Sequence, residues 1–243
     1  KIDPNINNRI KCAAFCEMDG YASANQTGDA YTKALKENNV EIVENFEVSK
    51  INNSNNNYEI IDVHGKKINA KKIVLAAGVY LEKILKLLDI SIKIKCFPQQ
   101  LIVTERMPEL LKTVITVAHG KLSLKQFENG TVLIGGGWPG KGNIENGYNE
   151  TIPENLIGNM RLACHAIPNL KNSRVSRVWL GLEAETDDAM PIIGELPNLK
   201  NAFIIGSIHS GYTSGPYMGK LLSEKILGKD VDLSLFDIRR LMN

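Results

Sequence analysis

The chain has 243 residues, enough to bury a sizeable core in one large domain or two small ones. Its formal net charge is +2 at pH 7, and its basic residues are scattered rather than gathered into a stripe, which excludes nucleic acid as a partner. No run of about 20 apolar residues is present, so the sequence predicts no transmembrane segment.

The cysteines constrain both metal chemistry and compartment. Cys12, Cys16, Cys96 and Cys164 form no paired C-x-x-C knuckles, so no metal site is predicted. Reduced, mostly buried thiols are typical of a cytoplasmic protein, and this is the location that we expect.

A helix followed by a strand is the first regular structure that the pattern predicts. Apolar residues recur at helical spacing over about residues 26–38, with Ala30 and Ala34 on one face. Asn39 is a plausible end for this helix, and a strand is expected over residues 40–43.

Several β segments come next. Strands over residues 46–51 and 58–63 are expected to pair across an asparagine-rich turn. The run over residues 68–77 predicts another pair of strands. The end of this run, Ile73 to Ala77, is wholly apolar, which is typical of a central strand covered on both faces, and Gly78 closes it.

The middle of the chain predicts an antiparallel sheet and then a helix. Four β-rich segments with alternating faces lie at residues 100–104, 114–117, 122–127 and 131–134. Apolar residues at helical spacing then predict a helix over about residues 153–166.

Two nucleotide-binding patterns in this region fail on physical grounds. Gly135 to Gly140 satisfies G-x-G-x-x-G, and Gly135 to Lys141 nearly matches a P-loop. Both motifs need a helix to begin there, and Pro139 with Gly142 cannot propagate one. A nucleotide-binding module of this kind is therefore excluded.

The most informative segments lie near the C-terminus. An apolar strand over residues 202–206 is followed by a glycine- and hydroxyl-rich loop, 207–215, that opens a helix. Such a loop presents free backbone N–H groups together with the positive end of the helix dipole. On physical grounds alone, this is a site for an anion or a cofactor.

These segments resemble the amine- and amino-acid-oxidising flavoproteins, the family of D-amino acid oxidase, glycine oxidase and sarcosine oxidase. Three ordered motifs and one further strand carry the resemblance. They are Trp179 with Gly181; Thr186, Asp188, Pro191 and Gly194; Gly206, His209, Gly211 and Gly215; and the strand Ile73 to Gly78, which is similar to a second FAD fingerprint.

The resemblance implies an α/β (α+β) fold with two parts. Residues 1–80 and 175–243 are expected to form an FAD-binding, Rossmann-like domain, and residues 81–174 a substrate domain built on an antiparallel β-sheet. The strand–glycine–helix unit that holds the FAD pyrophosphate in this family is not found in the sequence. We therefore expect the chain to be the C-terminal two-thirds of a family member that lacks its N-terminal βαβ unit.

The resemblance also implies a set of FAD-binding residues. Backbone N–H groups near Tyr212, Thr213 and Ser214, and a helix starting near Gly215, are expected to stabilise negative charge on the reduced flavin. The full cofactor-binding set is Val48, Ala77, Gly78, Trp179, Gly181, Gly206, His209, Gly211, Tyr212, Thr213 and Ser214.

Three residues are candidates for the chemistry itself. His209 is either a hydrogen-bond donor and acid or base near the ring, or a structural histidine satisfied by backbone. Tyr212 either closes the substrate pocket or packs. Glu183 stands where several family members carry an arginine that binds the substrate carboxylate, so it would repel a carboxylate and attract an amine. Asp188 is interpreted as holding its loop through backbone N–H groups rather than as a base.

The expected function is FAD-dependent oxidation of the C–N bond of a small amine or N-substituted amino acid, by hydride transfer to flavin. The segments 98–105 and 130–139 are similar to catalytic subunits of heteromeric family members, which implies other subunits as partners. The alternative is a non-catalytic flavoprotein-fold subunit that acts through partner binding.

Overall fold

The computed structural model describes residues 2–54, 57–118, 120–143 and 148–242. The chain forms two compact units: unit 1 contains Lys1–Ile42 and Pro98–Gly181, and unit 2 contains Val43–Phe97 and Leu182–Asn243. Residues 1–42 thus group with residues 98–181. From the sequence, residues 1–42 were instead expected to belong to the FAD-binding domain.

Unit 1 is built around an antiparallel sheet, as the alternating pattern predicts. Its strand order is β11-β5-β8-β7-β6. The strands are β5 (Lys95–Thr104), β6 (Ile115–Thr116), β7 (Ser123–Gln126), β8 (Val132–Gly135) and β11 (Val175–Glu185), with β9 (Lys141–Asn143) and β10 (Tyr148–Glu150) forming a separate antiparallel pair. Lys141 begins a strand and not a helix, which confirms the exclusion of a P-loop.

The helix α3 (Pro153–Ala166) packs its apolar side on this sheet and has the predicted bounds. Ala163 lies in one buried cluster with Leu124 of β7 and Ile134 of β8. The buried Asn159 side chain donates to Gly135 O at 3.0 Å, so it binds the helix to the end of β8. The 3₁₀ helix η2 (Pro168–Asn172) follows.

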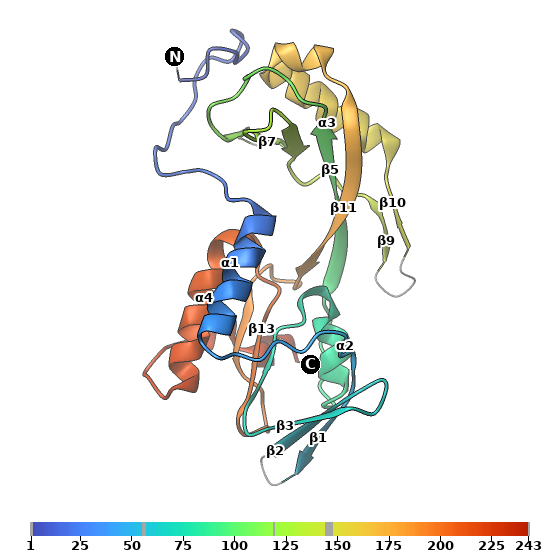
Figure 1. The fold of residues 1–243 in the computed structure, drawn as a ribbon, viewed down its shortest axis with the longest axis vertical. Coiled ribbons are helices and arrows are strands. Elements are labelled where there is room, and N and C mark those ends of the chain that lie inside the picture. Colours follow the sequence, from blue (N-terminus) through green and yellow to red (C-terminus); the bar gives the residue numbers. More distant parts are fainter. Residues whose placement is uncertain (1, 55–56, 119, 144–147, 243) are drawn as a thin grey trace. The chain divides into compact units, whose positions relative to one another are not determined.

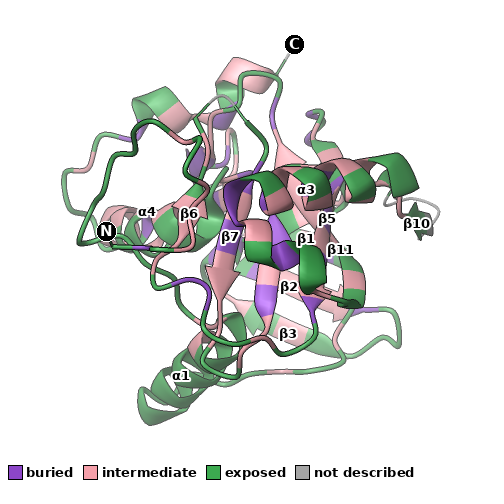
Figure 2. Cartoon of the chain, turned by 90° about the horizontal axis from the view of Figure 1, so that it is seen from above, coloured by how far each residue is buried: buried purple, intermediate pink, exposed green. Residues whose placement is uncertain are grey.

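The helix α1 (Ala24–Glu37) begins and ends at residues typical of caps. The Ser23 hydroxyl accepts from Gln26 N–H, and at the other end Asn39 is left-handed, with φ of 56°. No residue of α1 is buried, and Figure 2 shows the helix exposed along its length. The predicted strand over residues 40–43 is wrong: Val40 and Ile42 are exposed in non-strand chain, because no strand pairs with them among the described residues.

Unit 2 begins with a three-stranded antiparallel sheet of order β1-β2-β3. The strands are β1 (Val48–Ser54), β2 (Asn57–Asp62) and β3 (Lys67–Ala70). The predicted pairing of the first two strands is confirmed, although residues 55–56 of its turn lie outside the described residues. The predicted pairing within residues 68–77 is wrong, because β4 (Ile73–Leu75) joins a different sheet.

That second sheet has the order β12-β13-β4, and its strands β12 and β13 pack against other elements on both faces (Figure 1). It contains β12 (Ile192–Glu195) and β13 (Ala202–Gly206) beside β4. On one face, Ile193 and Phe203 pack with Leu222 of α4 (Gly211–Ile226). On the other, Ile204 packs with Leu81 in a cluster that includes residues of β1 and β2. The prediction of a central strand covered on both faces is wrong for β4, which is the outer strand of this sheet: Ile73 and Leu75 are buried on one face, whereas Val74 on the other is 44% exposed.

The remaining elements of unit 2 are short. They are the 3₁₀ helix η1 (Gly78–Tyr80), the helix α2 (Leu81–Lys86), and the 3₁₀ helices η3 (Ser234–Phe236) and η4 (Ile238–Leu241). Residue Ile238 of η4 is buried in the same cluster as Leu81.

The cysteines differ from the expectation of mostly buried thiols. Cys12 and Cys16 are exposed, whereas Cys96 and Cys164 are half-buried. Burial raises the pKa of the Cys96 and Cys164 thiols above its ordinary value. Among the helices of the described residues, none is long and apolar enough to cross a membrane.

Candidate active site at the carboxyl ends of β4 and β13

The candidate site forms where two parallel strands end side by side. In the β4–β13 pair, Ile73 lies opposite Ala202 and Leu75 opposite Ile204, so both strands run toward the same edge of the sheet. Ala77 and Gly78 follow β4 at this edge, and Gly206 is the last residue of β13. In open α/β sheets, ligands bind at the carboxyl ends of parallel strands. The sheet thus brings together two predicted groups of residues that lie far apart in the sequence.

Two glycines at this edge have physical reasons to be glycine. A Cβ on Gly206 would lie 2.5 Å from Cδ2 of Leu81, whose side chain is fully buried. Gly78 has φ of +55°, a left-handed conformation that residues other than glycine disfavour. Gly206 therefore lets β13 and α2 approach closely, and Gly78 makes the turn out of β4.

The loop after β13 has an unusual backbone. Ser207 and Ser210 are both left-handed, with φ of 49° and 55°. The helix α4 then starts at Gly211, four residues before the predicted start near Gly215. The N–H groups of Thr213 and Ser214 donate to Ser210 O at 2.9 and 3.1 Å. These two N–H groups, predicted to face a flavin, are therefore engaged within the first turn of the helix.

Ser207 has a buried hydroxyl without a partner among the described residues. The residue is 5% exposed, and its Oγ has no hydrogen-bond partner there. A buried polar atom of this kind has a free-energy cost unless a ligand or another group hydrogen-bonds it. Sequence reasoning missed Ser207 as a site residue, although a hydroxyl directly after an apolar strand was a signal.

The structure brings Glu183 and His209 together. Glu183, near the end of β11, places Oε1 3.1 Å from Nδ1 of His209 in the loop after β13. The Glu183 side chain is 36% exposed and that of His209 is 65% exposed, so both are accessible. His209 therefore faces a carboxylate. The nearby Tyr212 is 54% exposed.

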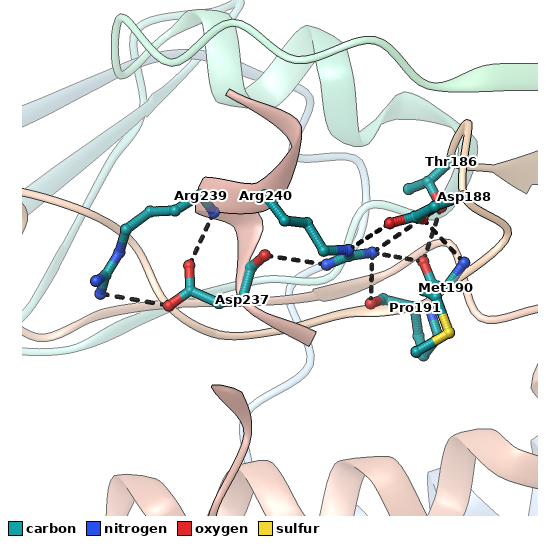
Figure 3. A network of polar contacts seen from close by, with 7 residues as sticks. All are labelled: Thr186, Asp188, Met190, Pro191, Asp237, Arg239 and Arg240. Atoms are coloured by element: carbon teal, nitrogen blue, oxygen red, sulfur yellow. Dashed lines mark hydrogen bonds and ion pairs between the residues drawn. The ribbon is translucent and has the colours of Figure 1, made fainter. Parts of the chain in front are cut away.

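Asp188 is held in a network that includes the C-terminal 3₁₀ helix (Figure 3). Its Oδ1 accepts from Met190 N–H at 3.1 Å and from the Thr186 hydroxyl at 2.7 Å, in agreement with the predicted loop-holding role. Arg240 also binds it, with Nε 2.7 Å from Oδ2. This ion pair holds the pKa of Asp188 well below its usual range, so the carboxylate stays ionised. Arg240 was not among the residues predicted for this site, although its side chain is only 20% exposed.

The other predicted residues lie on β1 and β11, which belong to other sheets. Val48, on β1, is partly buried against the cluster that contains Ile73, and a register shift follows it between Val48 and Lys50. Trp179 and Gly181 lie on β11 in unit 1, where the Arg177 guanidinium carbon is 5.5 Å from the centroid of the Trp179 ring. Their contact with a cofactor stays a prediction.

Comparison with known proteins assigns the family. Residues 1–225 match the model of the FAD-dependent oxidoreductase (DAO) family. The chain belongs to this family. The resemblance found in the sequence is thereby confirmed, and membership of the DAO family implies FAD as the cofactor.

Individual relatives agree with this assignment. The chain is 28% identical to hydrogen cyanide synthase subunit HcnC of Pseudomonas protegens, over 94% of this chain and 55% of that protein. It is 26% identical to one of the opine oxidase subunits of Rhizobium meliloti, over 98% of this chain and 61% of that protein. The chain thus spans a little over half the length of the curated relatives that it matches.

The fold agrees with that of a solved DAO-family structure. The crystal structure of glycine oxidase from Geobacillus kaustophilus superposes with a TM-score of 0.79 at 19% identity, over 90% of this chain and 59% of that one. At this identity the likeness shows the fold alone. The predicted combination of an FAD-binding α/β fold with antiparallel sheets is confirmed at that level.

Proposed function

We propose that the chain forms part of an FAD-dependent oxidoreductase that oxidises the C–N bond of a small amine or N-substituted amino acid by hydride transfer to flavin. The observation that carries the proposal is the edge where β4 and β13 end, with the Glu183–His209 pair and the buried Ser207 hydroxyl, which has no partner among the described residues. Membership of the DAO family supports it. We also propose that residues 1–80 and 175–243 serve FAD binding and residues 81–174 the substrate domain.

The residues at this edge fit a flavin. A flavin ring carries carbonyl and nitrogen acceptors, and the Ser207 hydroxyl is a donor that no described residue uses. Gly78 and Gly211 leave the backbone accessible, since they carry no side chain and no heavy atom lies closer than 3.9 Å to where their Cβ atoms would be. FAD, when bound, supplies the acceptor for a pair of electrons and a proton from the substrate carbon.

The protein's own groups stabilise charge. The N-terminal end of the 16-residue helix α4 carries a partial positive charge at the loop that begins with Ser207. This charge favours the gain of negative charge nearby. We expect Gly211 and Tyr212, the first residues of α4, to lie at the cofactor, as the predicted site has them.

Glu183 and His209 supply the acid–base and recognition groups of the proposal. With Nδ1–H donated to Glu183, the other ring nitrogen of His209, Nε2, holds a lone pair that can take a proton from a substrate ammonium. The Glu183 carboxylate attracts a cationic amine and repels a carboxylate. The proposed substrate is therefore an amine recognised through its positive charge.

The proposed partners are other subunits of a heteromeric enzyme. Two of the relatives are themselves named as subunits, of hydrogen cyanide synthase and of opine oxidase. We propose that this chain belongs to an assembly of the same general kind.

The test is a visible absorption spectrum of the whole protein, followed by anaerobic addition of candidate amines and amino acids. A flavin spectrum that bleaches with an amine supports the proposal. A colourless protein that does not take up added FAD would overturn it and leave the non-catalytic subunit as the better account.

Two variants localise the result. Ser207→Ala should weaken FAD binding, because it removes the buried donor. Ser223→Ala, on α4, is the matched control, since its exposed hydroxyl donates only to Lys220 O within the helix. Equal FAD affinity in the two variants would remove Ser207 from the proposed site.

A further inference from the structure

A second concave site lies within unit 1, on the outer side of α3. It is a hollow of about 710 Å³ formed by three segments: residues 7–9, the exposed side of α3 over residues 157–165, and residues 168–171 of η2. This volume is within the range of small-ligand sites. We call it the basic hollow, because Arg9, Arg161 and Lys171 line it and no Asp or Glu among the described residues does.

The walls of the basic hollow are held by specific contacts. Asn7 donates its backbone N–H to Ala166 O at 2.9 Å and its side-chain amide to His165 O at 2.7 Å. The same side chain accepts from Arg9 N–H at 3.0 Å. The N-terminal segment is thus fixed against the C-terminal end of α3, and Arg9 follows directly from this anchor.

The positive charge of the hollow has no partner in the described part of the chain. Basic residues at the end of a helix often serve its terminal carbonyls. Here Asn7 already caps two of those carbonyls, those of His165 and Ala166. Arg9, Arg161 and Lys171 form no ion pair with any described carboxylate. Three cations around one hollow repel each other, so an anion bound there would be favourable.

Part of the lining of the hollow is apolar. Ile157, Met160 and Pro168 line it, and Ile157 is 51% exposed although it is a large aliphatic residue. Cys164 also lines the hollow, and burial raises the pKa of its thiol, against the opposing effect of Lys171. Inorganic phosphate would leave these apolar side chains in water, whereas a ligand with an apolar body would cover them.

We propose that the basic hollow binds a small organic anion: a carboxylate or phosphate held by Arg9, Arg161 and Lys171, joined to an apolar body that packs on Ile157 and Met160. Arginine favours such anions because its planar guanidinium donates two parallel hydrogen bonds. This binding site goes beyond the proposed oxidoreductase activity and does not rest on it.

The experiment uses octanoate as the probe and ¹³C-methyl methionine NMR of the intact protein as the readout. Met160 lies in the hollow, and its resonance is assigned with Met160→Leu. Met18, 95% exposed, is the internal control for non-specific contact. We expect octanoate to shift the Met160 methyl saturably and the Met18 methyl little, and octan-1-ol to have a much weaker effect because it lacks the charge.

A double variant tests the charge. Arg161→Gln with Lys171→Gln should weaken octanoate binding about tenfold or more, since charge-assisted hydrogen bonds are lost. Arg174→Gln is the matched control, an exposed arginine three positions beyond Lys171 that does not line the hollow. Unchanged resonances from the other methionines establish that the variants are folded.

Three results would overturn the proposal. Equal shifts with octan-1-ol and octanoate would mean a site without anion recognition. An equal loss of affinity in Arg174→Gln and the double variant would mean only a diffuse effect of charge. A Met160 methyl that octanoate does not reach in the intact protein would mean that the hollow is covered by another chain rather than by a free ligand.

Discussion

Replacing Arg240 tests the main polar network of unit 2. Its Nη2 donates to Met190 O at 2.8 Å and to Pro191 O at 3.0 Å, and its Nη1 donates to Asp237 O at 3.0 Å. Its Nε forms the ion pair with Asp188 at 2.7 Å. One guanidinium therefore joins three backbone carbonyls and a carboxylate, from the 186–191 turn to the C-terminal 3₁₀ helix.

The expected cost of Arg240→Ala follows from these contacts. Each of the three carbonyls loses a hydrogen bond worth about 1 kcal/mol. The ion pair adds less than about 1 kcal/mol, because the Asp188 side chain is 39% exposed and water screens it. We expect a total destabilisation of about 3 kcal/mol. Arg240→Lys should lose about half as much stability, since lysine keeps the positive charge but not the planar guanidinium that donates several hydrogen bonds at once.

Native-state hydrogen exchange of the β12 amides is the appropriate assay. Exchange reports on the individual amides of β12 in unit 2, whereas both tryptophans, Trp138 and Trp179, lie in unit 1. A loss of about 3 kcal/mol should lower β12 protection by about two orders of magnitude. Arg239→Ala is the matched control, because Arg239 is 66% exposed and pairs with Asp237 at 3.4 Å. If the two variants lower β12 protection equally, the reasoning is refuted.

Three further predictions concern single groups in unit 2. Asp188→Asn should make the free energy of unfolding depend less on pH in acid. The pKa of this carboxyl lies below its ordinary 3.8, so its contribution to stability is complete above about pH 4 and is lost as the pH falls further. Urea unfolding midpoints of the two proteins between about pH 5 and pH 3 measure the difference. Gly206→Ala should destabilise unit 2 by about 1–3 kcal/mol through the collision with Leu81, and Leu81→Ala in the same chain should relieve part of that collision, which a double-mutant cycle detects. Tyr58→Phe should cost about 1–2 kcal/mol in β2 exchange protection, because the fully buried Tyr58 hydroxyl donates to Lys200 O at 2.7 Å; no loss would mean that this carbonyl finds another donor.

Local patterns in the sequence predicted local structure well. Pro153 in the first turn and the apolar residues at helical spacing predicted the bounds of α3. The left-handed Asn39 was correctly predicted to lie at the end of α1. The antiparallel sheet of unit 1 followed from alternation of apolar and polar residues. Each of these signals depends on residues a few positions apart, which is the range over which backbone geometry and capping act.

Pairing over long sequence distances was not predictable in the same way. The apolar run from Ile73 indicated a buried strand but not its neighbour, which is β13, about 130 positions further along the chain. The expected strand at residues 40–43 had a suitable pattern but no partner in the described part of the chain. A strand is stabilised by the hydrogen bonds of its neighbour, and composition alone does not identify that neighbour.

In the candidate site too, local features were predictable from the sequence and contacts between distant residues were not. The glycine-rich loop was visible as a motif, and Asp188 was correctly interpreted as a loop-holding residue. Arg240 was missed because it lies 52 positions from Asp188, and the contact between Glu183 and His209 joins two elements that the sequence treats separately. Ser207 needed the structure, since an unpartnered hydroxyl is defined only by its surroundings.

The Asp188–Arg240 network should act on the candidate site without touching it. The network fixes the turn that leads into β12, and β12 pairs with β13 so that Ile192 lies opposite Gly206. Gly206 directly precedes Ser207, the left-handed first residue of the loop. If the start of β12 pairs less firmly with Gly206, the loop that follows Gly206 is held less firmly as well. Arg240→Ala should therefore weaken FAD binding and raise exchange in residues 207–212, whereas Arg239→Ala should change neither. Unchanged exchange in that loop, together with lowered β12 protection, would show that β13 holds the loop without β12.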